Sequence, residues 1–118
     1  MITVKEVLNR KHFESAKVVA GKTGLNHGIK WIHILEVIDV KQLIKGNELI
    51  LTTGVILKDN EQGFLQFVQQ LSDLDVAGLC IELGMYIEVI PESVIILADS
   101  LDFPLIVFQE VVPFIGIT

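Results

Sequence analysis

The chain has a single cysteine and few basic residues. One cysteine, Cys80, among 118 residues excludes an internal disulfide, and its apolar neighbours place it in a buried strand rather than at a reactive surface. Nine Lys and Arg residues against fifteen Asp and Glu residues give a formal net charge of −6. Because this charge repels phosphate backbones, we do not expect the segment to bind DNA or RNA by itself.

Long apolar runs are also missing. Polar residues or glycine interrupt every apolar stretch before the roughly 20 residues that cross a bilayer, and Met1–Glu6 lacks the basic-then-apolar profile of a secretion signal. We therefore expect a cytoplasmic protein without membrane contact. With 51% hydrophobic residues and no linker or repeat, residues 1–118 are expected to form one domain. The apolar ending, residues 111–118, predicts that the chain is a piece of a longer protein.

The first third of the chain predicts a helix and two strands. Thr3 and Glu6 have the spacing of a capping box, so a helix is expected from about Val4 to Lys11. Strands are expected at 16–20 and 29–37, separated by a glycine-rich turn. The second strand is apolar on both faces, which predicts cover on both sides. Asp39 is expected to cap a brief helix at 40–44.

The remainder alternates strands with helices. Three apolar strands, at 49–51, 79–81 and 105–108, are separated by helical patterns at 60–73 and from Pro91 onward. Because right-handed crossover connections make such strands parallel, their carboxyl ends should share one edge. The predicted fold is α/β, with a mostly parallel central sheet flanked by helices and an N-terminal pair of strands attached.

Polar residues and glycines follow these strands, at the edge where open α/β sheets usually bind ligands. A candidate ligand site therefore comprises the following residues: Thr52, Thr53, Gly54, Glu82, Gly84, Glu110 and, from the preceding strand, Glu36. The hydroxyls and Gly54 form either a small-ligand loop or an ordinary turn. Glu82 and Glu110 are either solvated charges or an acid–base pair.

Other chemistry lacks its sequence signature. Gly21-Lys22-Thr23 resembles the end of a phosphate-binding loop, but Ala16 stands where that motif needs glycine. The histidines at 12, 27 and 33 lack metal-site spacing. No cofactor, metal or catalytic residue is therefore expected.

An ordered set of short motifs resembles the N-terminal domain of purine catabolism regulator (PucR) type transcription factors. The motifs, which cover essentially the whole chain, are Thr3–Leu8, Val18–Gly21 with Gly24-Leu25, Trp31-Ile32-His33 with Glu36, Gly46–Gly54 and Phe103-Pro104-Leu105. The resemblance implies a bacterial regulator in which this domain precedes a middle region and a C-terminal helix-turn-helix that binds DNA.

The resulting functional hypothesis is a non-enzymatic sensory domain, expected to form a homo-oligomer. It would bind a small-molecule effector or a partner domain and control the separate DNA-binding region. One alternative is a dimerisation domain without ligand, which would associate through Ile95, Ile96 and the apolar tail. The other is a small hydrolase or lyase that uses Glu82 and Glu110.

Overall fold

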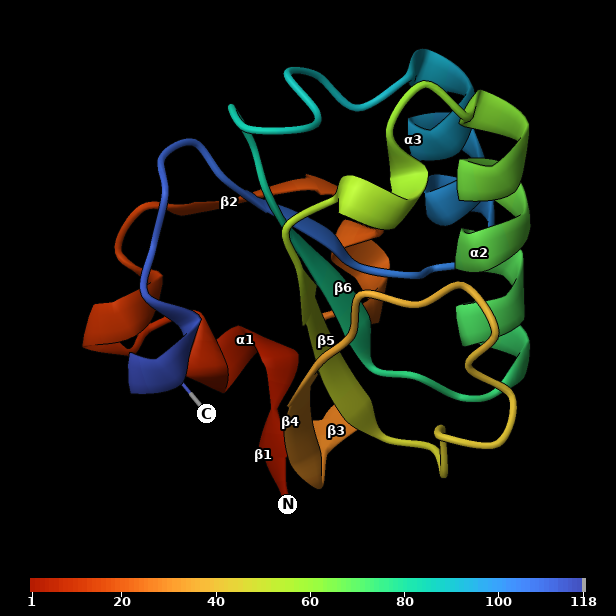
Figure 1. Cartoon of the computed structure of the whole chain (residues 1–118). Helices are drawn as coiled ribbons and strands as arrows, with labels where there is room; N and C mark the ends of the chain where they lie inside the picture. Colours follow the sequence, from red (N-terminus) through yellow and green to blue (C-terminus); the bar gives the residue numbers. More distant parts are fainter. Residues whose placement is uncertain (118) are drawn as a thin grey trace.

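The computed structural model describes residues 1–117, and it is built around one five-stranded sheet. The strand order is β2-β7-β6-β5-β4, and two further strands, β1 and β3, form a small antiparallel pair (Figure 1). The strands are β1 (Ile2–Thr3), β2 (Ala16–Ala20), β3 (Gly28–Ile29), β4 (Trp31–Ile34), β5 (Glu48–Thr52), β6 (Gly78–Glu82) and β7 (Leu105–Phe108). The α-helices are α1 (Val4–Val7), α2 (Glu61–Asp73) and α3 (Glu92–Ser100), and short 3₁₀ turns span Lys11–Phe13, Lys22–Gly24, Val55–Leu57 and Phe114–Gly116.

Four strands of the sheet run parallel. β4, β5, β6 and β7 pair in parallel, and β2 closes one edge antiparallel to β7. All residues of β5, β6 and β7 are buried, as expected for parallel strands covered on both faces. The predicted α/β class with a mostly parallel central sheet is confirmed.

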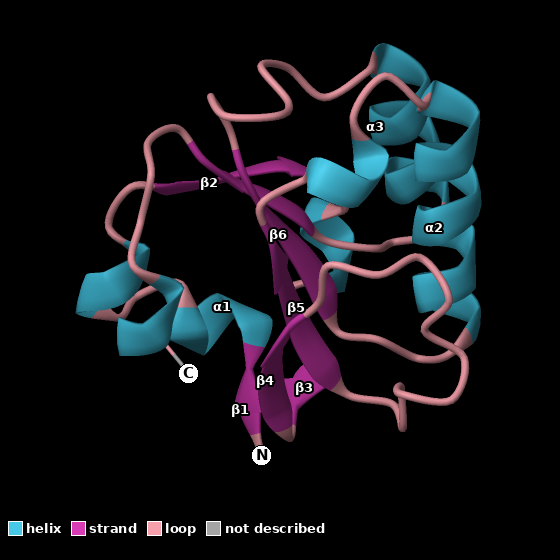
Figure 2. Ribbon diagram, in the orientation of Figure 1, coloured by secondary structure: helices cyan, strands magenta, loops and turns pink. Residues whose placement is uncertain are grey.

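The sheet lies between two layers (Figure 2). Helices α2 and α3 cover one face and enclose the larger apolar cluster, which includes Ile50, Leu79 and Val107. The N-terminal segment with α1 and the last 3₁₀ turn cover the other face. There, the Phe108 ring lies 5.6 Å from the Phe13 ring and 6.2 Å from the Phe114 ring, between centroids. The chain's two ends therefore build one layer of the core together.

Helix α2 follows from its sequence. The Asn60 side chain accepts the Gly63 N–H at 2.9 Å and so caps the first turn. The apolar stripe predicted for this helix faces the sheet, and its members Phe64, Phe67, Val68 and Leu71 are all buried. Each such side chain contributes roughly 1.5–3 kcal/mol relative to an exposed position. Packing against the sheet is therefore what holds the helix in place.

Helix α3 is amphipathic in the same sense. Val94 and Ala98 are buried, and Ile95 is partly buried against the core. Ile96, in contrast, is 60% exposed. Ile96 therefore lies on the solvent side of the helix.

The N-terminal elements differ from the prediction in extent. The Thr3–Glu6 capping box is present, but α1 ends at Val7, after which the chain turns into the 3₁₀ segment at 11–13. The helix predicted at 40–44 is a single turn, in which Leu43 and Ile44 N–H groups both donate to the Val40 carbonyl. Short segments such as these lack enough intrahelical bonds to extend without a packed face.

The two strands predicted before residue 38 do not form a pair with each other. The one at 16–20 is β2, at one edge of the sheet, and the one at 29–37 splits into β3 and β4, the latter at the opposite edge. The attached N-terminal pair is β1 with β3. The prediction that the second strand is covered on both sides is wrong for β4, because Trp31 and Ile34 are exposed.

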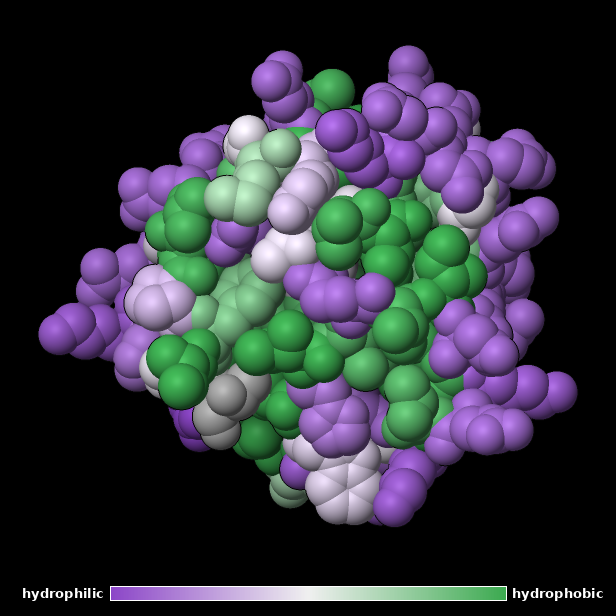
Figure 3. All heavy atoms as spheres, viewed as in Figure 1, coloured by the Kyte–Doolittle hydropathy of each residue, from purple (hydrophilic) through white to green (hydrophobic). Residues whose placement is uncertain are grey.

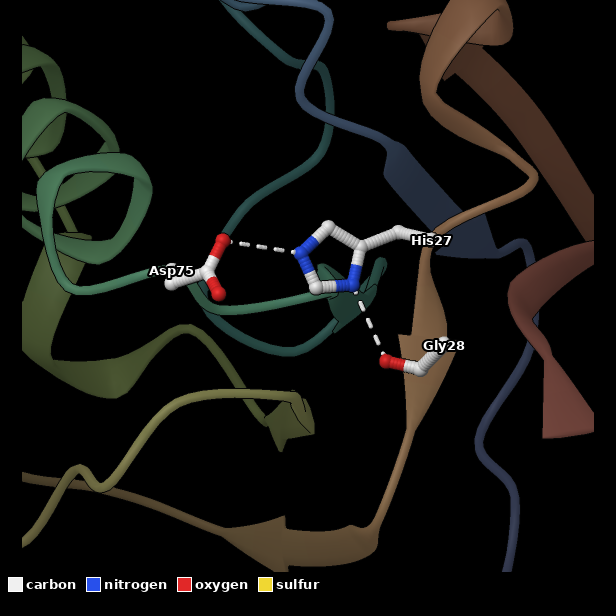
Figure 4. Close-up of polar contacts among 3 residues, drawn as sticks. All are labelled: His27, Gly28 and Asp75. Carbon is white, nitrogen blue, oxygen red and sulfur yellow. Dashed lines mark hydrogen bonds and ion pairs between the residues drawn. The ribbon is translucent and has the colours of Figure 1, made fainter. Parts of the chain in front are cut away.

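A polar contact links the turn before β3 to the turn after α2 (Figure 4). His27 Nε2 lies 3.1 Å from Asp75 Oδ1, and Nδ1 lies 2.9 Å from the Gly28 carbonyl oxygen. Because both neighbouring atoms are acceptors, the ring can donate both hydrogen bonds only as the imidazolium. The Asp75 side chain is 75% exposed, so even with His27 protonated this contact is a surface ion pair of small energetic weight.

Candidate functional site

The carboxyl ends of β5, β6 and β7 lie at one edge of the sheet. Parallel pairing aligns Thr52 with Ile81 and Glu82 with Phe108. Beyond the strands, the Leu83 N–H donates to the Phe108 carbonyl at 2.8 Å. The predicted convergence of the three strand ends is therefore present in the backbone.

Glu36 closes the end of β5. Its carboxylate accepts the Thr52 hydroxyl, the Thr53 hydroxyl at 2.5 Å and the Thr53 N–H at 3.1 Å. Thr52 is fully buried, and its hydroxyl oxygen in turn accepts the Gly54 N–H at 3.1 Å. We call these four residues the Glu36 clamp. The Glu36 clamp joins the segment after β4 to the loop after β5 through hydrogen bonds among its own polar atoms.

Gly54 and Gly84 shape the two loops that follow β5 and β6. Their φ angles are 87° and 110°, in the region that favours glycine. A Cβ on Gly54 would lie 2.9 Å from Ile87 Cδ1, whereas one on Gly84 would meet nothing within 4 Å. The Gly84 N–H donates to the Ile87 carbonyl at 2.8 Å, so Ile87 brings the two loops together.

Glu82 belongs to the opposite face of the sheet. Ile81 packs in the α2/α3 cluster, and successive strand residues alternate in direction, so the Glu82 side chain lies on the α1 side. It is 4% exposed, and its Oε2 accepts the Val112 N–H at 3.2 Å. Glu82 thus anchors the segment after β7. The exposed Glu110 lines a separate cavity of about 340 Å³ that also contains Lys11 and His12.

The seven predicted residues therefore share an edge but fall into two groups. The Glu36 clamp and Gly84 lie with the loops on the α2/α3 side, and Glu82 and Glu110 lie with the chain's C-terminal segment. The reason is the two-residue period of a strand, which sends Thr52 and Glu82 to opposite faces even though their strands end together.

A crevice opens farther along the same two loops. Its volume is about 350 Å³, within the size range of small-molecule sites. Its apolar part includes three buried side chains, Leu57, Phe64 and Ile87. The loop between β5 and α2 supplies Leu57, Asp59 and Asn60, α2 supplies Glu61 and Phe64, and the loop between β6 and α3 supplies Tyr86, Ile87, Glu88, Val89 and Pro91.

The crevice is acidic. Three of its lining residues, Asp59, Glu61 and Glu88, carry carboxylates, and none of the lining residues is Lys, Arg or His. Ser93 donates to Glu61 Oε2 at 2.9 Å, which leaves the Asp59 and Glu88 side chains as acceptors. Such a lining suits a neutral or positively charged ligand that presents N–H or O–H donors.

Sequence reasoning missed these crevice residues because it took the first polar positions after each strand. Those positions close the loops onto the sheet, whereas the crevice is lined several residues later. Asp59 did carry a signal, since Asp and Asn are favoured at positive φ, and its φ is 53°. A larger surface groove of about 660 Å³ runs along α2 beside Leu97, but it lies away from the strand ends.

Two further buried side chains need a physical account. Glu48, at the amino end of β5, is fully buried; its Oε2 accepts the Lys45 N–H at 2.6 Å, and its Oε1 has no partner among the described residues. It holds the loop before β5 against the sheet. Burial raises the pKa of the Cys80 thiol, because the thiolate would lose its hydration. Cys80 is thus a packing residue, as its sequence context indicated.

Comparison with known structures places the fold. A crystal structure of the CBS and DRTGG domains of the regulatory region of Clostridium perfringens pyrophosphatase, complexed with the activator diadenosine tetraphosphate, matches with a TM-score of 0.59. The match covers 92% of this chain and 44% of that chain at 13% sequence identity, so the two share a fold.

Sequence comparison identifies the family. The model of the purine catabolism regulatory protein-like family matches residues 6–118, and the chain belongs to that family. The purine catabolism regulatory protein of Bacillus subtilis is 32% identical over 109 residues, which are 92% of this chain and 20% of that protein. The transcriptional activator PmfR of Paenarthrobacter nicotinovorans is 21% identical over 117 residues, or 99% of this chain and 25% of the activator. The chain thus spans a fifth to a quarter of these relatives, and the resemblance stated from the motifs is confirmed.

Proposed function

We propose that this chain is the effector-sensing domain of a bacterial, cytoplasmic transcriptional regulator, and that the crevice between the β5–α2 and β6–α3 loops binds the effector. Family membership and the relatives' names, a regulatory protein and a transcriptional activator, support the regulatory part. The acidic crevice at the carboxyl edge of a parallel sheet is the observation that supports the binding part.

The chemistry of the crevice defines the class of effector. Carboxylates at 59, 61 and 88 and the Tyr86 hydroxyl favour a small, nitrogen-rich metabolite of neutral or positive charge, and they disfavour phosphates and carboxylic acids. We further propose that residues 1–118 form one domain of a longer regulator, whose helix-turn-helix lies outside this chain.

Control of the DNA-binding region would come from the two loops. Both begin at residues with strict backbone requirements, Gly54 and Gly84, and both contact Ile87. An effector that binds one arrangement of these loops more tightly would shift the equilibrium, and a useful coupling is about 1–3 kcal/mol.

A hydrolytic role for Glu82 and Glu110 is less well supported. Glu82 is buried and bonded to the main chain of Val112, whereas Glu110 is exposed and lines another cavity. An acid–base pair needs both carboxyls to face one substrate.

The test is a thermal-shift and calorimetric screen with purines, ureides and polyamines, and with phosphates and dicarboxylates as the opposite charge class. A true effector at 100 times its dissociation constant adds about 2.7 kcal/mol to the stability of the folded state. Glu88→Gln and Tyr86→Phe should each weaken its binding, and Glu110→Gln, in the separate cavity, is the matched control. Binding that Glu110→Gln removes and Glu88→Gln leaves intact would place the site elsewhere. The absence of stabilisation by any donor-rich compound would contradict the proposal.

A further inference from the structure

The outer edge of β4 is an exposed strand without a partner among the described residues. β4 is the last strand of the sheet, and β5 occupies its other side. Directly after β4, the Leu35 N–H donates to the Leu51 carbonyl at 2.9 Å, toward β5 and in the register of the ladder. Because alternate residues of a strand face the same neighbour, Trp31 and His33 also bond β5, and Ile32 and Ile34 direct their N–H and C=O groups outward.

The two edges of the sheet differ in protection. Natural sheets block open edges with charged residues or local irregularities. Strand β2 has both, an exposed Lys17 at its second position and a register shift between Val18 and Ala20. β4 reads Trp-Ile-His-Ile and pairs with β5 in an unbroken register from Trp31 to Ile34. The edge at β4 is therefore open to another strand.

Apolar surface surrounds this edge. Figure 3 shows hydrophobic side chains gathered over the face on which β4 and the following segment lie, with hydrophilic side chains around them. Trp31 and Ile34 are 43% and 42% exposed, and Val37, Ile38 and Leu43 are also exposed. An open surface hollow of about 400 Å³ is lined by residues 32–35 and by Leu43. Together these side chains expose on the order of 400 Å² of apolar surface, the size of the largest and often functional patch on a monomer.

We propose that β4 pairs antiparallel with β4 of a second copy of this chain and joins two sheets into one. The partner is a second copy because the strand complements itself about a two-fold axis through Ile32. In that register Ile32 forms a hydrogen-bonded pair with the partner's Ile32, and Trp31 lies opposite the partner's His33. Only Lys30 is charged between 30 and 35, so the net charge of −6 is kept away from the contact.

The area predicts a weak, reversible dimer. Two patches of this size, together with four outward-facing main-chain residues, bury an area near the lower limit of specific interfaces, about 1,000–1,200 Å² in total. The dimer should therefore form only when the protein concentration is in the micromolar range or above. This interface differs from the α3 contact through Ile95 and Ile96 that the sequence suggested.

Disulfide trapping tests the register. Ile32 and its copy form a hydrogen-bonded pair, in which Cα atoms lie about 5.5 Å apart, within reach of a disulfide. Ile32→Cys should give a covalent dimer under mild oxidation. Ile34→Cys, which would face the partner's Lys30, should cross-link at least about tenfold more slowly, since its copy lies out of disulfide reach. The native Cys80 is buried and contributes no background. Equal trapping of both variants, or none, overturns the register.

Sedimentation of the 118-residue chain tests the surface. Ile34→Lys places two charges in the dimer and should weaken it by about a hundredfold or more. Ile96→Lys, at a more exposed isoleucine on α3, should leave the dimer unchanged. Ile32→Pro removes one outward N–H without removing a hydrogen bond of the ladder to β5, and it should also weaken the dimer. Thermal unfolding checks that each variant is folded. The proposal is overturned if the chain stays monomeric up to about 1 mM. It is also overturned if the dimer survives Ile34→Lys or dissociates with Ile96→Lys.

Discussion

Removal of the Glu36 carboxylate should destabilise the domain more than its surface position suggests. Glu36→Ala deprives three donors of their acceptor: the Thr52 hydroxyl, the Thr53 hydroxyl and the Thr53 N–H. A hydrogen bond to a charged group contributes about 1.5–3 kcal/mol, and the partial exposure of Glu36 lets water replace some of it. We expect a net loss of about 2–4 kcal/mol in the free energy of unfolding. For a chain of this size that loss lowers the unfolding midpoint by roughly 8–16 °C.

Graded variants distinguish the loss of the clamp's hydrogen bonds from a general loss of packing. Glu36→Gln keeps one acceptor oxygen and should lose about half as much stability as Glu36→Ala. Thr53→Val combined with Glu36→Ala forms a double-mutant cycle, in which we expect a coupling energy of about 1–2 kcal/mol. Glu14→Ala removes an exposed carboxylate and should change stability by less than about 0.5 kcal/mol.

The measurement is chemical denaturation of all variants under one buffer condition, with calorimetry as a second probe. If Glu36→Ala behaves like Glu14→Ala, or if the cycle gives no coupling, the clamp does not hold the segment after β4 to the loop after β5.

Three other predictions rest on single positions. Gly54→Ala and Gly84→Ala share the backbone strain of a positive φ, but only the Cβ added at residue 54 would lie 2.9 Å from Ile87 Cδ1. Chemical denaturation should therefore show that Gly54→Ala loses more stability than Gly84→Ala, by about 1 kcal/mol or more. Equal losses would refute the steric argument. The Cys80 thiol should react with a disulfide reagent only as fast as the domain unfolds, because burial raises the pKa of the thiol and blocks access of the reagent. Rapid labelling under native conditions would contradict this prediction. Asp75→Asn should change stability by less than about 0.5 kcal/mol, because the ion pair to His27 is exposed and Asn tolerates the φ of 64° at this position. Asp75→Ala places at the same φ a residue that does not tolerate it, so this variant should be clearly less stable in the same assay.

The helix and strand order of the second half could be predicted because local and global signals agree there. The stripe of α2 has a 3.6-residue period, the strands at 49–51, 79–81 and 105–108 are continuous apolar runs, and crossover handedness makes them parallel. In the first third, short elements carry too little periodicity to define their ends, so α1 and the turn at 40–44 were predicted too long.

The sequence places the seven candidate residues in one site, whereas the structure puts them at one edge but divides them between two faces of the sheet. That Thr52, Glu82 and Glu110 end neighbouring strands follows from the order of elements. Which face each side chain takes depends on the phase of its strand, and whether Glu36 reaches Thr53 depends on how the segment after β4 folds back. Neither can be read from spacing.

The sequence by itself determined the class of fold, the family and the buried faces of α2 and the central strands, because apolar periodicity and short motifs are local properties. Only the tertiary structure decided which polar groups bind one another, where a crevice stays open and which strand is left at an edge. Those outcomes depend on contacts between residues far apart in the chain, such as Gly54 with Ile87 and Glu82 with Val112, which no local pattern encodes.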